Sequence, residues 1–280
     1  MRQHQHQCRL QTYEVTVPEN LPGHAQPRLA DLPSADYHLE KSRVSQAHVV
    51  TVGQGSRVAV LDSGATPDHP HGGLLEIGPS FIRGDGIDRN GHGTHVMGLV
   101  WQVAPMAEVV SVQVLNENNG GTWAGIVSGI RWCIEQGDID IINLSLGATG
   151  DTPELRSVID DAVAAGMVVC AASGNTGTDT KFYPAFYENV VAVGACDRTG
   201  DLWPFTSTGD IDTIAAGDTV LSNWLDGALA RASGTSMACP IVSGIFALAL
   251  SVDSYPTLKP SEVADAAKAV RADLTYIPFL

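Results

Sequence analysis

The stretch "DIINLSLGATGDTPELRSVIDDAVAAGMVVCAAS" spans residues 140–173 and holds the pattern that decides the fold. Its two ends are short apolar runs, which are typical of buried strands. Between them, residues 152–166 have the apolar spacing of an amphipathic helix, with Thr152 as a candidate N-cap and Pro153 at the first helical position. Two strands joined by a helical crossover predict a parallel pair.

The same alternation of strands and helices continues on both sides. Further buried strands are predicted at 57–62, 107–115, 189–195 and 211–217, and a further helix at 123–137. Continuous apolar strands separated by helices indicate an α/β fold, doubly wound, with a mostly parallel central sheet and helices on both faces. Residues 1–40, rich in Gln, His and Pro, are predicted to form an N-terminal extension before a single domain at 41–280.

The composition excludes some partners. The 280-residue chain has a net charge of −15 and lacks the basic clusters that phosphate binding needs, so no nucleic acid and no membrane surface are expected as partners. Its start lacks the apolar core of a secretory leader, and its five cysteines form no CxxC pair. We therefore expect a cytoplasmic protein, and its oligomeric state stays open.

Four polar residues stand where predicted elements begin or end. Asp62 closes one strand and Asn175 follows another, whereas His92 and Ser236 each lie at the start of an apolar helix. Open α/β sheets place their sites at the carboxyl ends of the strands. The four side chains are therefore predicted to converge above one edge of the sheet.

The positions of the histidines limit which catalytic order is possible. All nine lie within the first 95 residues, so a histidine base for Ser236 must come from far upstream. The order Ser, Asp, His of α/β-hydrolases is excluded, because no histidine follows Ser236 and no GxSxG motif is present. The order Asp, His, Ser stays open.

Five blocks of sequence resemble the ordered signatures of the subtilisin-like serine proteases, the S8 subtilases. They are "VAVLDSGATPDHP" (58–70), "NGHGTHVMG" (90–98), "NLSLG" (143–147), "CAASGN" (170–175) and "GTSMACP" (234–240). The chain is most similar to the intracellular subtilisins, since no leader is visible and "RLQTYEV" lies at 9–15. The resemblance implies a subtilisin-like fold and an endopeptidase that hydrolyses unstructured polypeptides without an organic cofactor.

The resemblance also implies a role for each polar residue. Asp62 would orient His92, and His92 would take the proton from Ser236, which forms the acyl-enzyme. Asn175 and the Ser236 N–H would stabilise the oxyanion. The chain at 41–280 would then be the catalytic domain.

Substrate binding is implied for segments that would pair with an extended peptide. The residues concerned are Asn119, Gly120, Gly121, Ser145, Leu146, Gly147, Ala172 and Gly174. The loop 176–182 would help to build the S1 pocket, which holds the side chain of the P1 residue, the residue whose carbonyl is attacked. Family analogy implies a large apolar or aromatic P1 residue.

Two cation sites of the family lead to different expectations. The high-affinity calcium site is expected to be absent, because His71 replaces a ligand Asp and the helix after His92 has no inserted loop. A weaker site for Ca²⁺ or Na⁺ is implied, with three carbonyl ligands and one carboxylate. Its ligands would be Ala185, Tyr187, Val190 and Asp212.

Several alternatives remain beside this interpretation. Ser236 is also placed where an N-cap serine would stand. His95 follows His92 by three residues, but a packed helix-face residue is the better interpretation because zincin spacing is absent. Cys239 and Cys170 are expected to be buried apolar residues, with a thiol switch as the alternative.

The strand-like segment "QTYEVTV" (11–17) could serve as a short inhibitory prosegment, or be an edge strand or tail without that role. At the level of function, a dedicated leader-peptide maturation protease and a catalytically silent peptide-binding module are the alternatives to a general endopeptidase.

Overall fold

The computed structural model describes residues 7–9, 13–16, 37, 39 and 44–252. Its strands are β1 (Gln7–Arg9), β2 (Tyr13–Thr16), β3 (Arg57–Asp62), β4 (Leu74–Ser80), β5 (Glu108–Gln113), β6 (Gly120–Thr122), β7 (Ile141–Leu144), β8 (Val168–Ala172), β9 (Val191–Cys196), β10 (Thr213–Ala216), β11 (Val220–Asn223) and β12 (Leu229–Ser233). Its helices are α2 (Val44–Ala47), α3 (His92–Val103), α4 (Trp123–Gln136), α5 (Pro153–Ala164), the 3₁₀ helix η2 (Leu225–Gly227) and α6 (Thr235–Leu250).

A seven-stranded sheet forms the centre of the molecule, in the order β10-β9-β8-β7-β3-β5-β4. Every pairing between its neighbouring strands is parallel. The strand–helix–strand prediction is confirmed by β7, α5 and β8, and Thr152 caps α5 by accepting from the Leu155 N–H at 3.2 Å.

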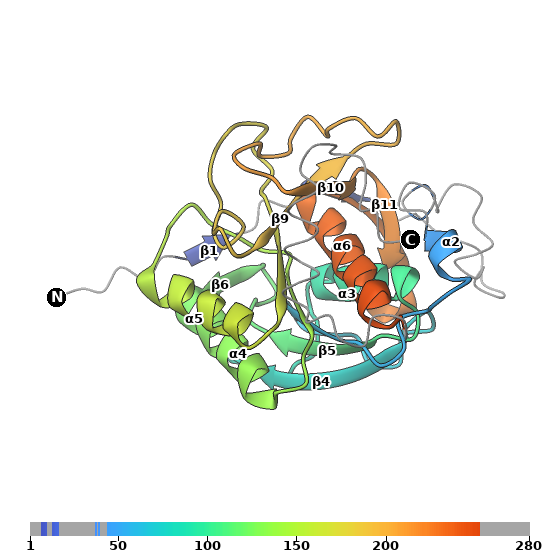
Figure 1. Ribbon diagram of the computed structural model, residues 1–280, viewed down its shortest axis with the longest axis horizontal. Coiled ribbons are helices and arrows are strands. Elements are labelled where there is room, and N and C mark those ends of the chain that lie inside the picture. The colour runs from blue at the N-terminus through green and yellow to red at the C-terminus, as the bar shows by residue number, and fades with distance from the viewer. Residues whose placement is uncertain (1–6, 10–12, 17–36, 38, 40–43, 253–280) are drawn as a thin grey trace.

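Helices cover both faces of this sheet (Figure 1): α3 and α6 lie on one face, and α4 and α5 on the other. The side chains of β3 alternate accordingly. Val58 and Val60 pack in the core with α3 and α6, whereas Ala59 and Leu61 pack in the core with α4 and α5. The doubly wound α/β prediction is confirmed.

Two smaller sheets lie beside the central one. In one of them, β12 pairs with β11 on one side and with β2 on the other, and in the second β1 pairs with β6. Both sheets join the N-terminal extension to the rest of the chain. Tyr37 and Leu39 also pack against the core between the sheet, α3 and α6.

Strand β4 and the β11–β12 hairpin were not predicted from the sequence. Strand β4 reads "LLEIGPS", with exposed and partly exposed residues and a proline, so it lacks the apolar run of a buried strand.

Within the described part of the chain, no helix is long and apolar enough to span a bilayer.

Candidate active site

Asp62 and His92 form a buried pair at the carboxyl end of β3. His92 Nδ1 lies 2.8 Å from Asp62 Oδ1, and the two side chains are 5% and 1% exposed. The same carboxylate oxygen accepts the Ser63 N–H at 2.7 Å. The close approach depends on Gly93, because a Cβ there would lie 2.4 Å from the Gly64 carbonyl oxygen.

A second buried carboxylate, Asp88, holds the start of α3. Its Oδ1 accepts the Gly91 N–H and the Ser63 hydroxyl, each at 2.9 Å. Its Oδ2 accepts the Thr94 N–H at 2.9 Å and the Thr94 hydroxyl at 2.7 Å. A carboxylate also suits the positive end of the helix dipole. Asp88 therefore fixes the turn from which His92 projects.

Burial and charge act in opposite directions on the imidazole. Burial lowers the pKa of His92, and the charge and hydrogen bond of Asp62 raise it, leaving the pKa above its ordinary value. Among the described residues, His92 Nε2 has no hydrogen-bond partner. The ring therefore presents one nitrogen to Asp62 and one to the site.

Ser236 lies in the first turn of α6, where Gly234 is the N-cap. The alternative that Ser236 is an ordinary N-cap is therefore wrong. Its Oγ donates to the Ser145 carbonyl at 3.1 Å instead of to His92. Catalytic hydrogen bonds often tighten only when substrate is present, so this orientation does not remove His92 as its partner.

A chain of polar groups anchors Ser236 to the sheet. The Ser145 hydroxyl donates to the Ser236 carbonyl at 2.9 Å and accepts from Asn143 Nδ2 at 3.0 Å. Asn143 Oδ1 in turn accepts the Ser243 hydroxyl at 2.9 Å. Asn143, Ser145 and Ser243 are each 0% exposed, so the start of α6 is fixed by fully buried hydrogen bonds.

Asn175 faces the same helix start. Its Oδ1 accepts the Thr235 N–H at 2.9 Å and the Thr235 hydroxyl at 3.0 Å, and Gly174 N–H donates to that hydroxyl at 3.1 Å. These bonds orient the amide so that Nδ2 lies on its other side. The N–H groups in the first turn of a helix have no acceptor within the helix. An anion near Ser236 would therefore meet hydrogen-bond donors.

The predicted substrate-binding residues lie at the ends of two strands, β7 and β8, and at the start of a third, β6. Ser145, Leu146 and Gly147 leave β7, and Ala172 and Gly174 lie at the end of the adjacent β8. On the other side, Gly120 and Gly121 form β6, preceded by Asn119. Gly121 bridges Leu115 on one side and pairs with Cys8 of β1 on the other. The extension thus lies along a segment predicted to bind substrate.

A comparison with known protein families shows to which family the chain belongs. The model of the Subtilase family matches residues 53–272, which is most of the chain. The chain belongs to the subtilase family. As a subtilase, it is a serine endopeptidase, and the resemblance seen in the five sequence blocks is confirmed.

Several curated subtilases are similar to the chain over most of its length. Subtilisin DY of Bacillus licheniformis is 38% identical over 240 residues, covering 79% of this chain and 85% of the relative. Thermitase of Thermoactinomyces vulgaris is 34% identical, covering 78% and 83%. An intracellular serine protease of Paenibacillus polymyxa is 39% identical, covering 71% and 67%.

The alternative roles considered for His95, Cys170 and Cys239 are decided by how deeply these side chains are buried. His95 is fully buried, with its Nε2 3.1 Å from the Ala230 carbonyl oxygen, so the prediction of a packed residue is confirmed. Cys170 and Cys239 are buried and lie outside any disulfide. Burial raises the pKa of Cys239 well above its ordinary value, which disfavours the reactive thiolate of a switch.

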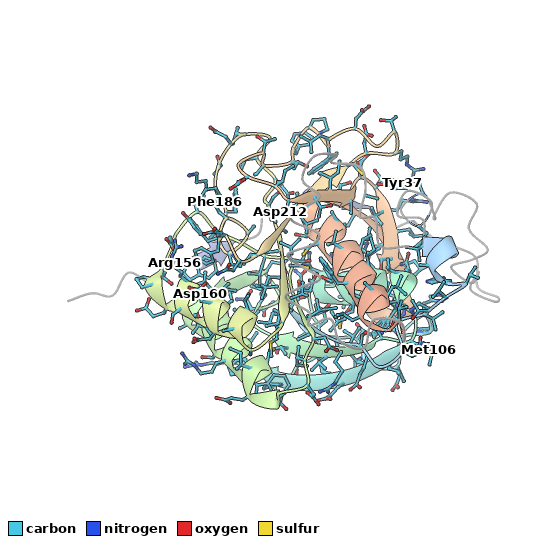
Figure 2. The ribbon with its side chains drawn as sticks, in the orientation of Figure 1. Tyr37, Met106, Arg156, Asp160, Phe186 and Asp212 are labelled. Atoms are coloured by element: carbon cyan, nitrogen blue, oxygen red, sulfur yellow. The ribbon has the colours of Figure 1, made fainter. Side chains whose placement is uncertain are left out.

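The weak cation site predicted from the resemblance would be formed by Ala185, Tyr187, Val190 and Asp212. Subtilases commonly use calcium, and carbonyl and carboxylate oxygens suit that ion. Asp212 is 9% exposed, and its Oδ2 accepts the Ala192 N–H at 2.9 Å (labelled in Figure 2). In the described part of the chain, no three His, Cys, Asp or Glu side chains gather into a metal site. A site with one carboxylate and three backbone carbonyls is a different arrangement, which needs no such cluster.

Sequence reasoning missed Asp88, Thr235 and Ser63, which position the catalytic candidates. A signal for Asp88 was present, because an Asp shortly before an apolar helix is typical of an N-terminal cap. Thr235 stands in the "GTSMACP" block beside Ser236, but its partner, Asn175, lies 60 residues earlier. Such a contact depends on the fold and leaves no local pattern.

Proposed function

We propose that this subtilase cleaves unstructured polypeptides through Asp62, His92, Ser236 and Asn175. The observation that carries the proposal is the buried Asp62–His92 pair at 2.8 Å, above the same sheet edge as Ser236 and Asn175. The order Asp, His, Ser along the chain is also the order of the triad in subtilisin.

The roles follow from the geometry and the chemistry of acyl transfer. Ser236 Oγ attacks the peptide carbonyl while His92 Nε2 takes its proton, and Asp62 stabilises the resulting imidazolium. Asn175 Nδ2 and the Ser236 N–H donate to the oxyanion. His92 then protonates the leaving amine, and water hydrolyses the acyl-enzyme in the reverse sequence of proton transfers.

The test compares the wild-type chain with Ser236→Ala on an unfolded protein, with cleavage sites read by mass spectrometry. We expect cleavage by the wild type alone and covalent labelling of Ser236 by a fluorophosphonate. Labelling without cleavage of the unfolded protein would favour a maturation protease with one leader peptide as its substrate. Absence of both would favour a silent peptide-binding module.

We further propose that residues 1–40 act as an inhibitory prosegment for the catalytic domain at 41–280. Strand β1 pairs antiparallel with β6, in the register Cys8 with Gly121, along the edge predicted to hold substrate. Strand β2 pairs with β12, whose last residue, Ser233, lies three positions before Ser236. The extension therefore pairs with a segment predicted to hold substrate and with the strand that leads into the helix of Ser236. Residues 11, 12 and 17 of the predicted strand segment lie outside the described residues.

Removing residues 1–25 tests the prosegment. Main-chain pairing along β6 would be available to substrate, so we expect the deletion to lower KM on the unfolded protein and to leave kcat close to its value before deletion. Equal KM values for the full and shortened chains would contradict the proposal. Circular dichroism of both chains would show whether the fold is retained.

A cation site, a location and a class of partner complete the proposal. We propose a weak Ca²⁺ or Na⁺ site formed by Ala185, Tyr187, Val190 and Asp212, with no cation required for the chemistry. We propose a cytoplasmic location, because one relative is an intracellular serine protease. Polypeptides are the proposed partners, and the acidic charge disfavours nucleic acid.

A further inference from the structure

The space next to the reacting carbonyl is bounded by two backbone segments. This inference rests on the proposed function, in which Ser236 attacks a peptide held between Ser145–Gly147 and Ala172–Gly174. The two segments follow β7 and β8, which are adjacent parallel strands, so they leave the sheet side by side. The P1 side chain of a bound peptide would enter the gap between them.

The ring of Phe182 lies in that gap. A Cβ at Gly174 would lie 2.4 Å from Phe182 Cδ2 and 2.7 Å from its Cε2. A Cβ at Gly147 would lie 3.6 Å from Phe182 Cβ and 3.7 Å from its Cδ1. One edge of the ring therefore faces each wall, and only glycine at position 174, with φ of +104°, permits the contact.

The backbone next to Phe182 is fixed by hydrogen bonds to Ala148, which follows Gly147 in the chain. Tyr183 N–H donates to the Ala148 carbonyl at 2.8 Å, and Ala148 N–H donates to the Tyr183 carbonyl at 3.1 Å. On the other side, Phe186 N–H donates to the Phe182 carbonyl at 2.8 Å. The backbone on both sides of Phe182 is therefore held in place by hydrogen bonds, and the residue is half-buried.

We propose that Phe182 fills the S1 pocket and restricts the P1 residue to glycine, alanine or serine. Protein interiors are close-packed, so a leucine or phenylalanine at P1 would have to displace the ring or lose its own position beside Ser236. The ring of Phe182 would thus select substrates by the size of their P1 side chain. It is opposite to the large apolar P1 residue that family analogy implies.

Fluorogenic peptides that differ only at P1, with Ala, Leu or Phe, test the proposal on the full chain. We expect wild-type kcat/KM to favour Ala over Phe by roughly 10- to 200-fold, the range that a size misfit in a pocket produces. Phe182→Ala should remove most of that preference by raising kcat/KM for the Phe peptide. Ratios within one preparation cancel any inhibition by the N-terminal extension.

Phe186→Ala is the matched control. Phe186 belongs to the same segment, but its ring packs edge-on against Tyr183, with centroids 5.9 Å apart, and against Lys181, whose Nζ lies 4.0 Å from its ring centroid. This variant should keep the wild-type ratio. Phe182→Leu, a smaller change in volume, should give an intermediate ratio and serves if Phe182→Ala does not fold.

The outcomes separate this inference from the proposed function. A wild-type chain that is labelled at Ser236 but cleaves the Phe peptide as well as the Ala peptide overturns the inference alone. So does an unchanged ratio in folded Phe182→Ala or Phe182→Leu. A chain that is neither labelled nor active on any peptide overturns both proposals.

Discussion

The two ends of strand β3 carry charge pairs of opposite character. At its first residue, Arg57 forms ion pairs with carboxylates that are between 39% and 61% exposed: Glu76, Glu108 and Asp138. At its last residue, Asp62 contacts His92 with both side chains at most 5% exposed. One short strand thus connects a charge cluster whose carboxylates reach solvent, although Arg57 itself is only 17% exposed, with a buried pair.

The two sets of charges differ in their effect on the residues that form them. Exposed ion pairs are screened by water and salt and contribute little to the free energy of unfolding. A buried pair changes the protonation behaviour of its members, and here the pKa of His92 is raised despite burial. Substitutions at the Asp62 end should therefore affect catalysis, and substitutions at the Arg57 end should not.

The largest effect is expected for Asp62→Asn. An amide keeps the shape but lacks the charge that stabilises protonated His92, and it favours the wrong tautomer, so kcat should fall by roughly 10⁴-fold. Steady-state kinetics on the Ala peptide would measure it. A loss of less than tenfold would contradict the role given to the buried pair.

The pH profile of the same two proteins sharpens this result. His92 acts as a base only when neutral, so wild-type kcat/KM should fall as the pH drops through its pKa, which lies above the ordinary value of about 6.5. Without the Asp62 charge, that inflexion should move to lower pH. An inflexion at the same pH in both proteins would show that Asp62 does not set the pKa of His92.

The next largest effect is expected for Asn175→Ala. The substitution removes one oxyanion donor, and kcat should fall by roughly 10²- to 10³-fold with little change in KM, as the corresponding change does in subtilisin itself. Asn189→Ala is the control, because Asn189 bonds Asp160 on the exposed surface at 3.1 Å. An equal loss in both variants would point to a general structural effect.

The sequence predicted the elements and residues whose signals are local. Strand β3 and helix α5 follow from apolar periodicity, and Asp62, His92 and Ser236 stand at element ends within recognisable blocks. The hairpin β11–β12 was missed because short strands with polar residues have no such run.

The contacts that orient the site could not be predicted in this way. The hydroxyl of Ser236 points to Ser145, 91 residues earlier, and Phe182 reaches the glycines of two other segments. These contacts depend on how loops approach one another after the sheet has formed. They are properties of packing, and no spacing in the chain encodes them.

A smaller effect is expected for Asp88→Asn. Its two carboxylate oxygens accept backbone and hydroxyl donors, so an amide would face a donor with its own N–H groups and shift the start of α3. A displacement of about 1 Å at His92 can cost up to about 10²-fold in kcat. Asp85→Asn, which alters an exposed pair with Arg89, is the control in kinetics and thermal unfolding. A kcat for Asp88→Asn equal to that of the wild type would contradict this positioning role.

The smallest effect is expected for Asp138→Asn at the opposite end of β3. Asp138 is 61% exposed, and Arg57 keeps Glu76 and Glu108 as partners, so the free energy of unfolding should fall by less than about 1 kcal/mol. The kcat/KM should stay at its wild-type value, because the substitution lies at the far edge of the sheet from Ser236. Urea unfolding and peptide kinetics check both statements. A catalytic loss near that of Asp62→Asn would mean that the two ends of β3 are coupled, and the contrast between a solvated and a buried pair would no longer explain where the function lies.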